Sequence, residues 1–189
     1  GGVRWCAVCR PRWTNGTGIQ PGERVLGLAS TGLHTTGYSL ARQIVLDTLG
    51  LAFDSLVPEV GDTVAGALLR THRSYLKCVR PLLARGLVKG MAHITGGGIP
   101  GNLSRILPEG VSARIEADRW TVPPLFSFLQ RGGDVPRHEM FRAFNMGIGL
   151  ILACAPSDAD LTLGILKDEG EDPKLIGEIV PGNREVLGV

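Results

Sequence analysis

Three consecutive glycines, Gly96, Gly97 and Gly98, stand between a short apolar run and a short helical pattern in the segment AHITGGGIPGNL. Glycine leaves the backbone unhindered, so main-chain N–H groups at the end of a strand and the start of a helix can converge on an anion such as a phosphate. Thr95 adds a hydroxyl donor to the same bend. The segment therefore predicts a loop that binds an oxyanion through its main chain.

The run from Gly96 to Gly101 also matches the pattern G-x-G-x-x-G, and Glu116 lies at the end of the next expected strand. This arrangement is similar to the fingerprint of dinucleotide-binding domains. Pro100 interrupts the loop, however, and Pro108 stops the following helix before it could cover a sheet of that type. A dinucleotide-dependent oxidoreductase therefore stays open as an alternative, as does a tight turn that binds nothing.

A second loop, in the segment ASTGLHTTGYS, links a buried strand to a helix. Ser30, Thr31 and Thr36 offer hydroxyl groups, and Gly32 offers an open backbone. His34 offers an imidazole whose charge changes near neutral pH. Two such loops in one domain could line one binding site. Because loop histidines are more often surface residues than catalysts, the structural alternative for His34 is an exposed side chain.

Two further polar residues stand next to apolar strands. His93 lies within the strand before the glycines, where the structural alternative to catalysis is a core imidazole with satisfied hydrogen bonds. Asn145 precedes a strongly apolar strand and could either bind a ligand or fix a loop. Gly147 and Gly149, at the start of that strand, indicate that another segment approaches it closely.

The composition is that of an ordinary globular protein, with 189 residues, 43% hydrophobic residues and a net charge of +2. Basic residues are scattered and aromatic residues are few, so we expect no nucleic-acid partner. No apolar run reaches the roughly 20 residues of a membrane span. Cys6 and Cys9 form a C-x-x-C without a second pair, so the sequence predicts no metal-binding residues. Cys78 and Cys154 are expected in the core as reduced thiols.

Strands and helices interleave along the chain, which predicts an α+β fold (α/β type). Ser39 is the expected N-cap of the first helix. Residues 10–22 are expected to form a connector and residues 51–62 to be irregular. The expected strands span residues 3–9, 24–30, 90–94, 111–117, 147–155 and 174–180. The expected helices span residues 39–49, 64–69, 74–84, 102–107, 124–131, 137–143 and 157–169.

Four segments together resemble one family: GERVLGLASTGLHTTGYSLAR, AHITGGGIPGNLSRILPEG, WTVPPLFSFLQRGGDV and EMFRAFNMGIGLIL. They follow one another in the order seen in the phosphoribosylformylglycinamidine cyclo-ligases, also called AIR synthetases, and the closing IGEIVPG fits as well. The resemblance covers roughly residues 19–181. It implies the mixed β-sheet with packed helices of the family's C-terminal domain over residues 19–189. Residues 1–18 would be the end of the preceding ATP-binding domain and a linker.

The resemblance implies ATP-dependent ring closure of formylglycinamidine ribonucleotide to aminoimidazole ribonucleotide, a step of purine biosynthesis. It implies ATP and Mg²⁺ held mainly by the other domain, a phosphorylated ribonucleotide substrate, a homodimer and a cytoplasmic location. The 189 residues alone are therefore expected not to close the ring. The candidate catalytic residues are His34 and His93. The candidate substrate-binding residues are Ser30, Thr31, Gly32, Thr36, Thr95, Gly96, Gly97, Gly98 and Asn145.

The chain departs from the family at three places. Thr31-Gly32-Leu33-His34 stands where Ser-Gly-Pro-His is common. Thr35-Thr36 stands where Ser-Asn is frequent, and Thr71-His72-Arg73 stands where Pro-Thr-Arg is usual. Other ATP-using members of the superfamily therefore remain alternatives: the glutamine-dependent amidotransferase of the preceding step, selenophosphate synthetase, thiamine monophosphate kinase and a hydrogenase maturation factor. A non-catalytic nucleotide-binding module is a further alternative.

Overall fold

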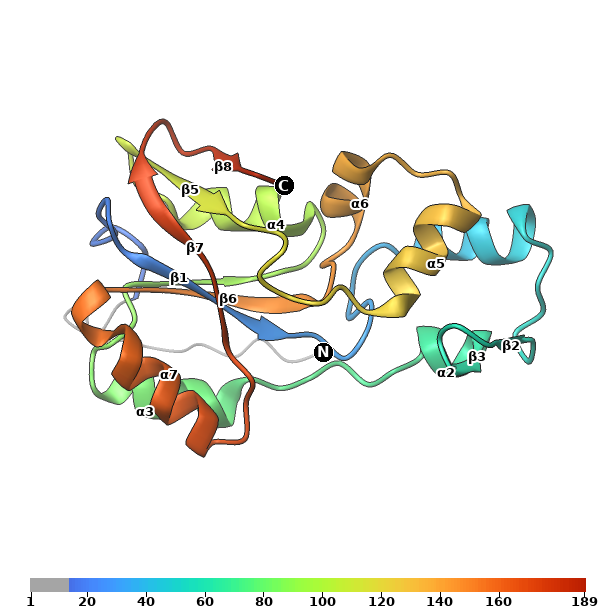
Figure 1. Ribbon diagram of the computed structural model, residues 1–189, viewed down its shortest axis with the longest axis horizontal. Coiled ribbons are helices and arrows are strands. Elements are labelled where there is room, and N and C mark those ends of the chain that lie inside the picture. Colours follow the sequence, from blue (N-terminus) through green and yellow to red (C-terminus); the bar gives the residue numbers. More distant parts are fainter. Residues whose placement is uncertain (1–13) are drawn as a thin grey trace, which may run out of the picture.

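The computed structural model describes residues 14–189, so the strand expected at 3–9 and the C-x-x-C pair lie outside the described residues. Six strands form one sheet in the order β4-β6-β1-β7-β5-β8 (Figure 1). All neighbours pair antiparallel except β5 and β8, which run parallel. The strands are β1 (Arg24–Ala29), β4 (Gly90–His93), β5 (Val111–Ile115), β6 (Ile148–Cys154), β7 (Lys174–Pro181) and β8 (Val186–Leu187). The expected mixed sheet is confirmed.

Helices cover both faces of this sheet, with α3 and α7 on one side and α4 and α6 on the other (Figure 1). Because both faces are covered, every residue of β6 is buried. The helices are α1 (Tyr38–Arg42), α2 (Val64–Leu68), α3 (Leu76–Ala84), α4 (Gly98–Leu103), α5 (Pro124–Gly132), α6 (Arg137–Ala143) and α7 (Ala159–Asp168).

The alternation of side chains along the central strands divides the core into two clusters. Val25 of β1 packs into the cluster that includes α4, α5 and α6. Leu26 and Leu28 are both buried in the other cluster with α3 and α7. In β6, Ile151 packs into the first cluster and Leu152 into the second. The two central strands are thus apolar on both faces, as expected for strands with helices on each side.

Several expected boundaries are wrong for identifiable reasons. The first helix begins at Tyr38, after Gly37 with a left-handed φ of 78°, so Ser39 is not its N-cap. The chain then continues as a π-helical turn over Gln43–Thr48. The helix expected from residue 102 begins at Gly98, inside the glycine loop. Residues 51–62, expected to be irregular, contain β2 (Leu56–Val57), which pairs with β3 (Asp62–Thr63).

The dinucleotide-binding interpretation of the glycine loop is wrong for the described residues. β4, which leads into the loop, pairs antiparallel with its neighbour β6. A dinucleotide-binding sheet is mostly parallel. Cys78 and Cys154 are buried and unpaired, as expected. Among the helices of residues 14–189, none has the length and apolar character that crossing a bilayer needs.

Candidate functional site

The two predicted loops leave the same edge of the sheet because of the strand order. β1 and β4 each pair antiparallel with β6, so they run in the same direction on either side of it. Leu28 of β1 and His93 of β4 both face Leu150 of β6 in register. The loops that follow the two strands therefore emerge together, beside the start of β6. A Cβ atom added to Gly96 would lie 3.9 Å from Thr36 Oγ1, which brings the two loops into contact.

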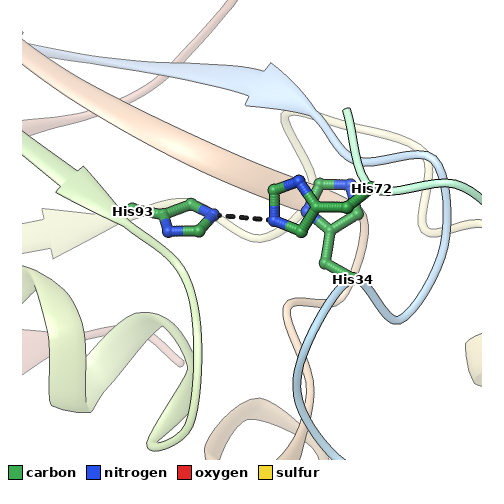
Figure 2. A group of neighbouring side chains, drawn as sticks. All are labelled: His34, His72 and His93. Atoms are coloured by element: carbon green, nitrogen blue, oxygen red, sulfur yellow. Dashed lines mark hydrogen bonds between the residues drawn. The ribbon is translucent and has the colours of Figure 1, made fainter. Parts of the chain in front are cut away.

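Three imidazoles gather where the loops meet (Figure 2). His34 comes from the loop after β1, and His93 is the last residue of β4. Between them lies His72, from the segment that joins α2 to α3. His72 Nε2 is 3.0 Å from His93 Nε2, and the ring centroids of His34 and His72 are 4.0 Å apart. The two candidate catalytic histidines are thus joined by a third, which sequence reasoning noted only as a departure from the family pattern.

His34 is 4% exposed, so the expected alternative of a surface side chain is wrong. Its Nε2 accepts a hydrogen bond from the Thr31 N–H at 3.0 Å. Its Nδ1 is buried and has no hydrogen-bond partner among residues 14–189. A Cβ atom added to Gly149 would lie 2.6 Å from His34 Cε1. The close approach that the glycine of β6 indicated is therefore shared by this imidazole and by the hydroxyl group of Tyr75, which would lie still closer to the added Cβ.

The environment keeps two of these imidazoles neutral. Burial lowers the pKa of His34 to about 4, and repulsion from His72, His93 and Arg73 adds to the effect. Burial also lowers the pKa of His93, followed by repulsion from His72. His93 is nevertheless exposed, so the expectation of a core imidazole is wrong. At pH 7 both rings can accept a proton or donate a hydrogen bond. Because they are uncharged, they do not attract a bound anion by charge.

The glycine loop is held by one buried amide. Asn102 Nδ2 donates to the carbonyl oxygens of Thr95, Gly96 and Gly98, at 3.1, 3.2 and 2.8 Å. Within residues 14–189, the N–H groups of Gly96 and Gly97 donate no hydrogen bond, and both glycines are exposed. The loop thus turns carbonyl groups toward Asn102 and leaves two N–H groups for a ligand. Sequence reasoning missed Asn102, although its place just after the glycines was visible.

Asn145 makes a full set of hydrogen bonds within the protein. Its Oδ1 accepts from Ser30 Oγ and from the Gly147 N–H, each at 2.9 Å. Its Nδ2 donates to the carbonyl oxygens of Gly32 and Leu33, at 2.8 and 3.2 Å. The side chain is 0% exposed. Of the two roles considered for Asn145, the geometry supports fixing the loop.

The remaining candidates are divided between the exposed site and the protein interior. Thr31 is exposed, and its hydroxyl donates to the carbonyl oxygen of Thr71. Thr36 is buried, and its hydroxyl donates to the carbonyl oxygen of Ala143 at 3.2 Å. Gly98 is buried with a φ of 60°, and an added Cβ would overlap the carbonyl oxygen of Phe141. Thr36 and Gly98 are therefore buried within the two loops, where their contacts are with the protein itself.

A cavity of about 490 Å³ adjoins the loop after β1. Its walls include Ser30, Thr31 and Gly32, together with the side chain of Arg70 and the start of α5. This volume lies within the range of small-molecule sites. Arg70 is exposed and was missed by sequence reasoning, because an isolated arginine carries no pattern. Arg70 forms an ion pair with Asp62 at 3.4 Å, and Arg73 forms a shorter one with Glu171 at 2.6 Å.

The comparison with protein families gives one match, to the family described as "AIR synthase related protein, C-terminal domain", over residues 20–189. A phosphoribosylformylglycinamidine cyclo-ligase of Trichlorobacter lovleyi is 46% identical over 165 residues, which cover 87% of this chain and 47% of that protein. The cyclo-ligase of Geobacter sulfurreducens is 46% identical over 172 residues, 91% of this chain and 49% of that protein. The chain thus spans about half the length of the curated relatives it matches.

Solved structures share the fold at low sequence identity. Thiamine-monophosphate kinase of Stenotrophomonas maltophilia matches with a TM-score of 0.63 and 17% identity, covering 95% of this chain and 54% of that one. Thermotoga maritima PurL complexed with FGAR matches with a TM-score of 0.54 and 14% identity, covering 91% and 26%. PurL complexed with AMPPCP matches with a TM-score of 0.52 and 16% identity, covering 92% and 24%.

Proposed function

This chain belongs to the AIR synthase related protein family, as its C-terminal domain, and from that premise we propose that it is the substrate-binding half of a phosphoribosylformylglycinamidine cyclo-ligase. The whole enzyme would use ATP to close formylglycinamidine ribonucleotide to aminoimidazole ribonucleotide in purine biosynthesis. The observation that carries the proposal is the meeting of the glycine loop, the loop after β1 and the imidazoles at one edge of the sheet. In this proposal residues 19–189 form the domain and residues 1–18 end the preceding one.

The substrate phosphate would bind to the main chain of the glycine loop. Gly96 and Gly97 present N–H groups without partners in the described chain, and Asn102 holds the neighbouring carbonyl groups away. Backbone N–H groups in such a bend bind anions well, because the hydrogen bonds to a charged oxygen are strong. His34 and His93 are neutral at pH 7, so the positive charge that lines the cavity is that of Arg70, which also pairs with Asp62 at 3.4 Å. The ribose and the acyclic base would then extend into the cavity beside Thr31.

Ring closure forms a C–N bond and breaks a C–O bond. ATP first phosphorylates the amide oxygen, the amidine nitrogen then attacks the activated carbon, and phosphate leaves with the electron pair. The nitrogen must release a proton. His72 donates its Nδ1–H to the Arg73 carbonyl oxygen, so its Nε2 accepts from His93 and leaves His93 Nδ1 with a free lone pair. The exposed His93 is therefore our candidate proton acceptor, and His34 positions the rings.

ATP and Mg²⁺ belong to the other half of the enzyme in this proposal. Mg²⁺ prefers carboxylate oxygens and water. The candidate site offers imidazoles, hydroxyl groups and amides, and Asp62, near the cavity, is paired with Arg70 at 3.4 Å. We therefore expect that the 189 residues bind substrate without turning it over. The proposal also includes the homodimer and the cytoplasmic location of the complete enzyme.

Calorimetric titration of the chain with formylglycinamidine ribonucleotide tests the proposal. In the Gly96→Ala variant the added methyl group meets only Thr36 Oγ1 at 3.9 Å, so the loop keeps its shape. The methyl group would nevertheless stand where the phosphate approaches the main chain. We expect binding to weaken by about tenfold or more, which is about 1.4 kcal/mol.

The matched control is Gly101→Ala in α4, where an added Cβ meets nothing within 4 Å. This variant should bind substrate as the unchanged chain does. Equal binding by Gly96→Ala and the unchanged chain would contradict the assignment of the glycine loop, and absence of any binding would contradict the substrate-binding role. Turnover by the 189 residues at the rate of a complete cyclo-ligase would contradict the assignment of ATP to the other half.

A further inference from the structure

One nitrogen from each of His34, His72 and His93 lies within 4.8 Å of the other two (Figure 2). Three imidazoles are a frequent ligand set for zinc, with Zn–N distances of about 2.0–2.1 Å. Tetrahedral coordination at these distances places the nitrogens about 3.3 Å from one another. The distance of 3.0 Å between His72 Nε2 and His93 Nε2 is already close to this value, so the main movement required is an approach of His34 by at most about 1.5 Å.

His72 is oriented as a ligand by its second nitrogen. Its Nδ1 lies 2.8 Å from the carbonyl oxygen of Arg73, which can only accept a hydrogen bond. The proton of the neutral ring is therefore on Nδ1, and Nε2 carries the lone pair that faces His93. A backbone carbonyl group that fixes the tautomer in this way is the usual outer partner of a metal-binding histidine.

His34 can also offer a nitrogen. Its buried Nδ1 has no hydrogen-bond partner in the described chain, which is unusual for a buried polar atom. Its Nε2 lies 3.2 Å from Thr31 Oγ1, whose own proton goes to the carbonyl oxygen of Thr71. In the alternative tautomer Thr31 Oγ1 can therefore accept the Nε2 proton, and His34 gives up the hydrogen bond from the Thr31 N–H. That tautomer leaves Nδ1 with a free lone pair.

We propose that His34, His72 and His93 bind one divalent transition-metal ion of the zinc class. Neutral imidazole nitrogens suit Zn²⁺, Ni²⁺ and Cu²⁺ far better than Mg²⁺, which requires oxygen ligands. On binding, the ion takes the place of the proton between His72 Nε2 and His93 Nε2, and that proton moves to Nδ1 of the exposed His93. The metal-bound chain therefore lacks the His93 lone pair that the proposed ring closure uses, so metal binding and proton acceptance by His93 exclude each other. Three protein ligands leave a coordination position for water or for an oxygen of a bound molecule. This inference does not rest on the proposed function, because metal binding requires neither ATP nor substrate.

The test is titration of the untagged, EDTA-stripped chain with Zn²⁺, and separately with Mg²⁺, by calorimetry. Co²⁺ then serves as a spectroscopic probe of the ligand type. The variants are His72→Thr, which installs the residue usual in the family pattern, and His93→Gln. The matched control is His138→Gln, because His138 lies on α6 with its side chain 69% exposed and outside the cluster. A Cys6→Ser/Cys9→Ser variant detects an ion held by those thiols.

We expect one Zn²⁺ to bind to the unchanged chain, to His138→Gln and to the double-cysteine variant. Removing a residue that merely hydrogen-bonds to a zinc ligand weakens zinc affinity by about 10- to 100-fold. His72→Thr and His93→Gln remove a ligand itself, so each should weaken Zn²⁺ binding by at least about tenfold. The Co²⁺ complex should show d–d bands without thiolate charge transfer. Circular dichroism of the metal-free variants checks that they fold. If His72→Thr misfolds, His93→Gln still provides the test, because His93 is exposed and its replacement leaves the core unchanged. Any of three results would overturn the proposal. The folded histidine variants could bind Zn²⁺ as tightly as the unchanged chain, the double-cysteine variant could be the only one to lose the ion, or the unchanged chain could bind no Zn²⁺.

Discussion

Acidification should destabilise this domain through His34. Burial and the neighbouring imidazoles lower the pKa of this residue from 6.5 to about 4 in the folded chain. In the unfolded chain the pKa returns to about 6.5. Between these two values the unfolded state binds a proton that the folded state does not. The free energy of unfolding is therefore highest above pH 6.5 and falls as the pH decreases toward 4.

The size of the effect follows from the two pKa values. A tenfold difference in proton affinity corresponds to about 1.36 kcal/mol, so the full effect is about 3 kcal/mol once the pH is below 4. At pH 5 about 2 kcal/mol of this should already be lost relative to pH 8. Most carboxyl groups remain ionised at pH 5, so the histidine effect is separated from general acid denaturation. The folded domain is expected to have only about 5–15 kcal/mol of stability, so this loss is easily measured.

Urea unfolding at pH 8 and pH 5, with EDTA present to remove metal ions, is the assay. The His34→Gln variant should lose most of the difference of about 2 kcal/mol, and a smaller part should remain because the pKa of His93 is also lowered. His138→Gln, at an exposed position, should keep the whole difference. If His34→Gln and the unchanged chain showed the same dependence on pH, the reasoning that His34 is buried in its neutral form would be refuted.

Two further predictions concern the loops. Gly98→Ala places a Cβ against the Phe141 carbonyl oxygen at a φ of 60°, so we expect a loss of about 2 kcal/mol or more, whereas Gly101→Ala should be neutral or slightly stabilising by urea unfolding. Asn145→Asp keeps the acceptor oxygen but faces a carboxylate toward the carbonyl oxygen of Gly32. We expect it to destabilise by about 2–3 kcal/mol, and full stability by the same assay would show that the amide does not fix the loop.

Long elements with a clear hydrophobic pattern were predictable from the chain alone. The strands expected at 24–30, 90–94 and 147–155 are present within one or two residues of those limits. The strands β2, β3 and β8 were missed, since two-residue strands have no period and exist only through their partners. The early start of α4 was missed because Asn102, a residue within the helix itself, holds the preceding loop.

By itself the sequence determined the chemical character of two loops, the family and the residue types available to a ligand, because these depend on local order along the chain. Only the tertiary structure decided that His72 joins His34 and His93, since these residues are far apart in sequence and no local pattern links them. The physical reason is the shared pairing of β1 and β4 with β6, which sends both loops to one edge of the sheet. The same packing buries His34 against Gly149 and so makes the imidazole neutral, a property that only its surroundings can confer.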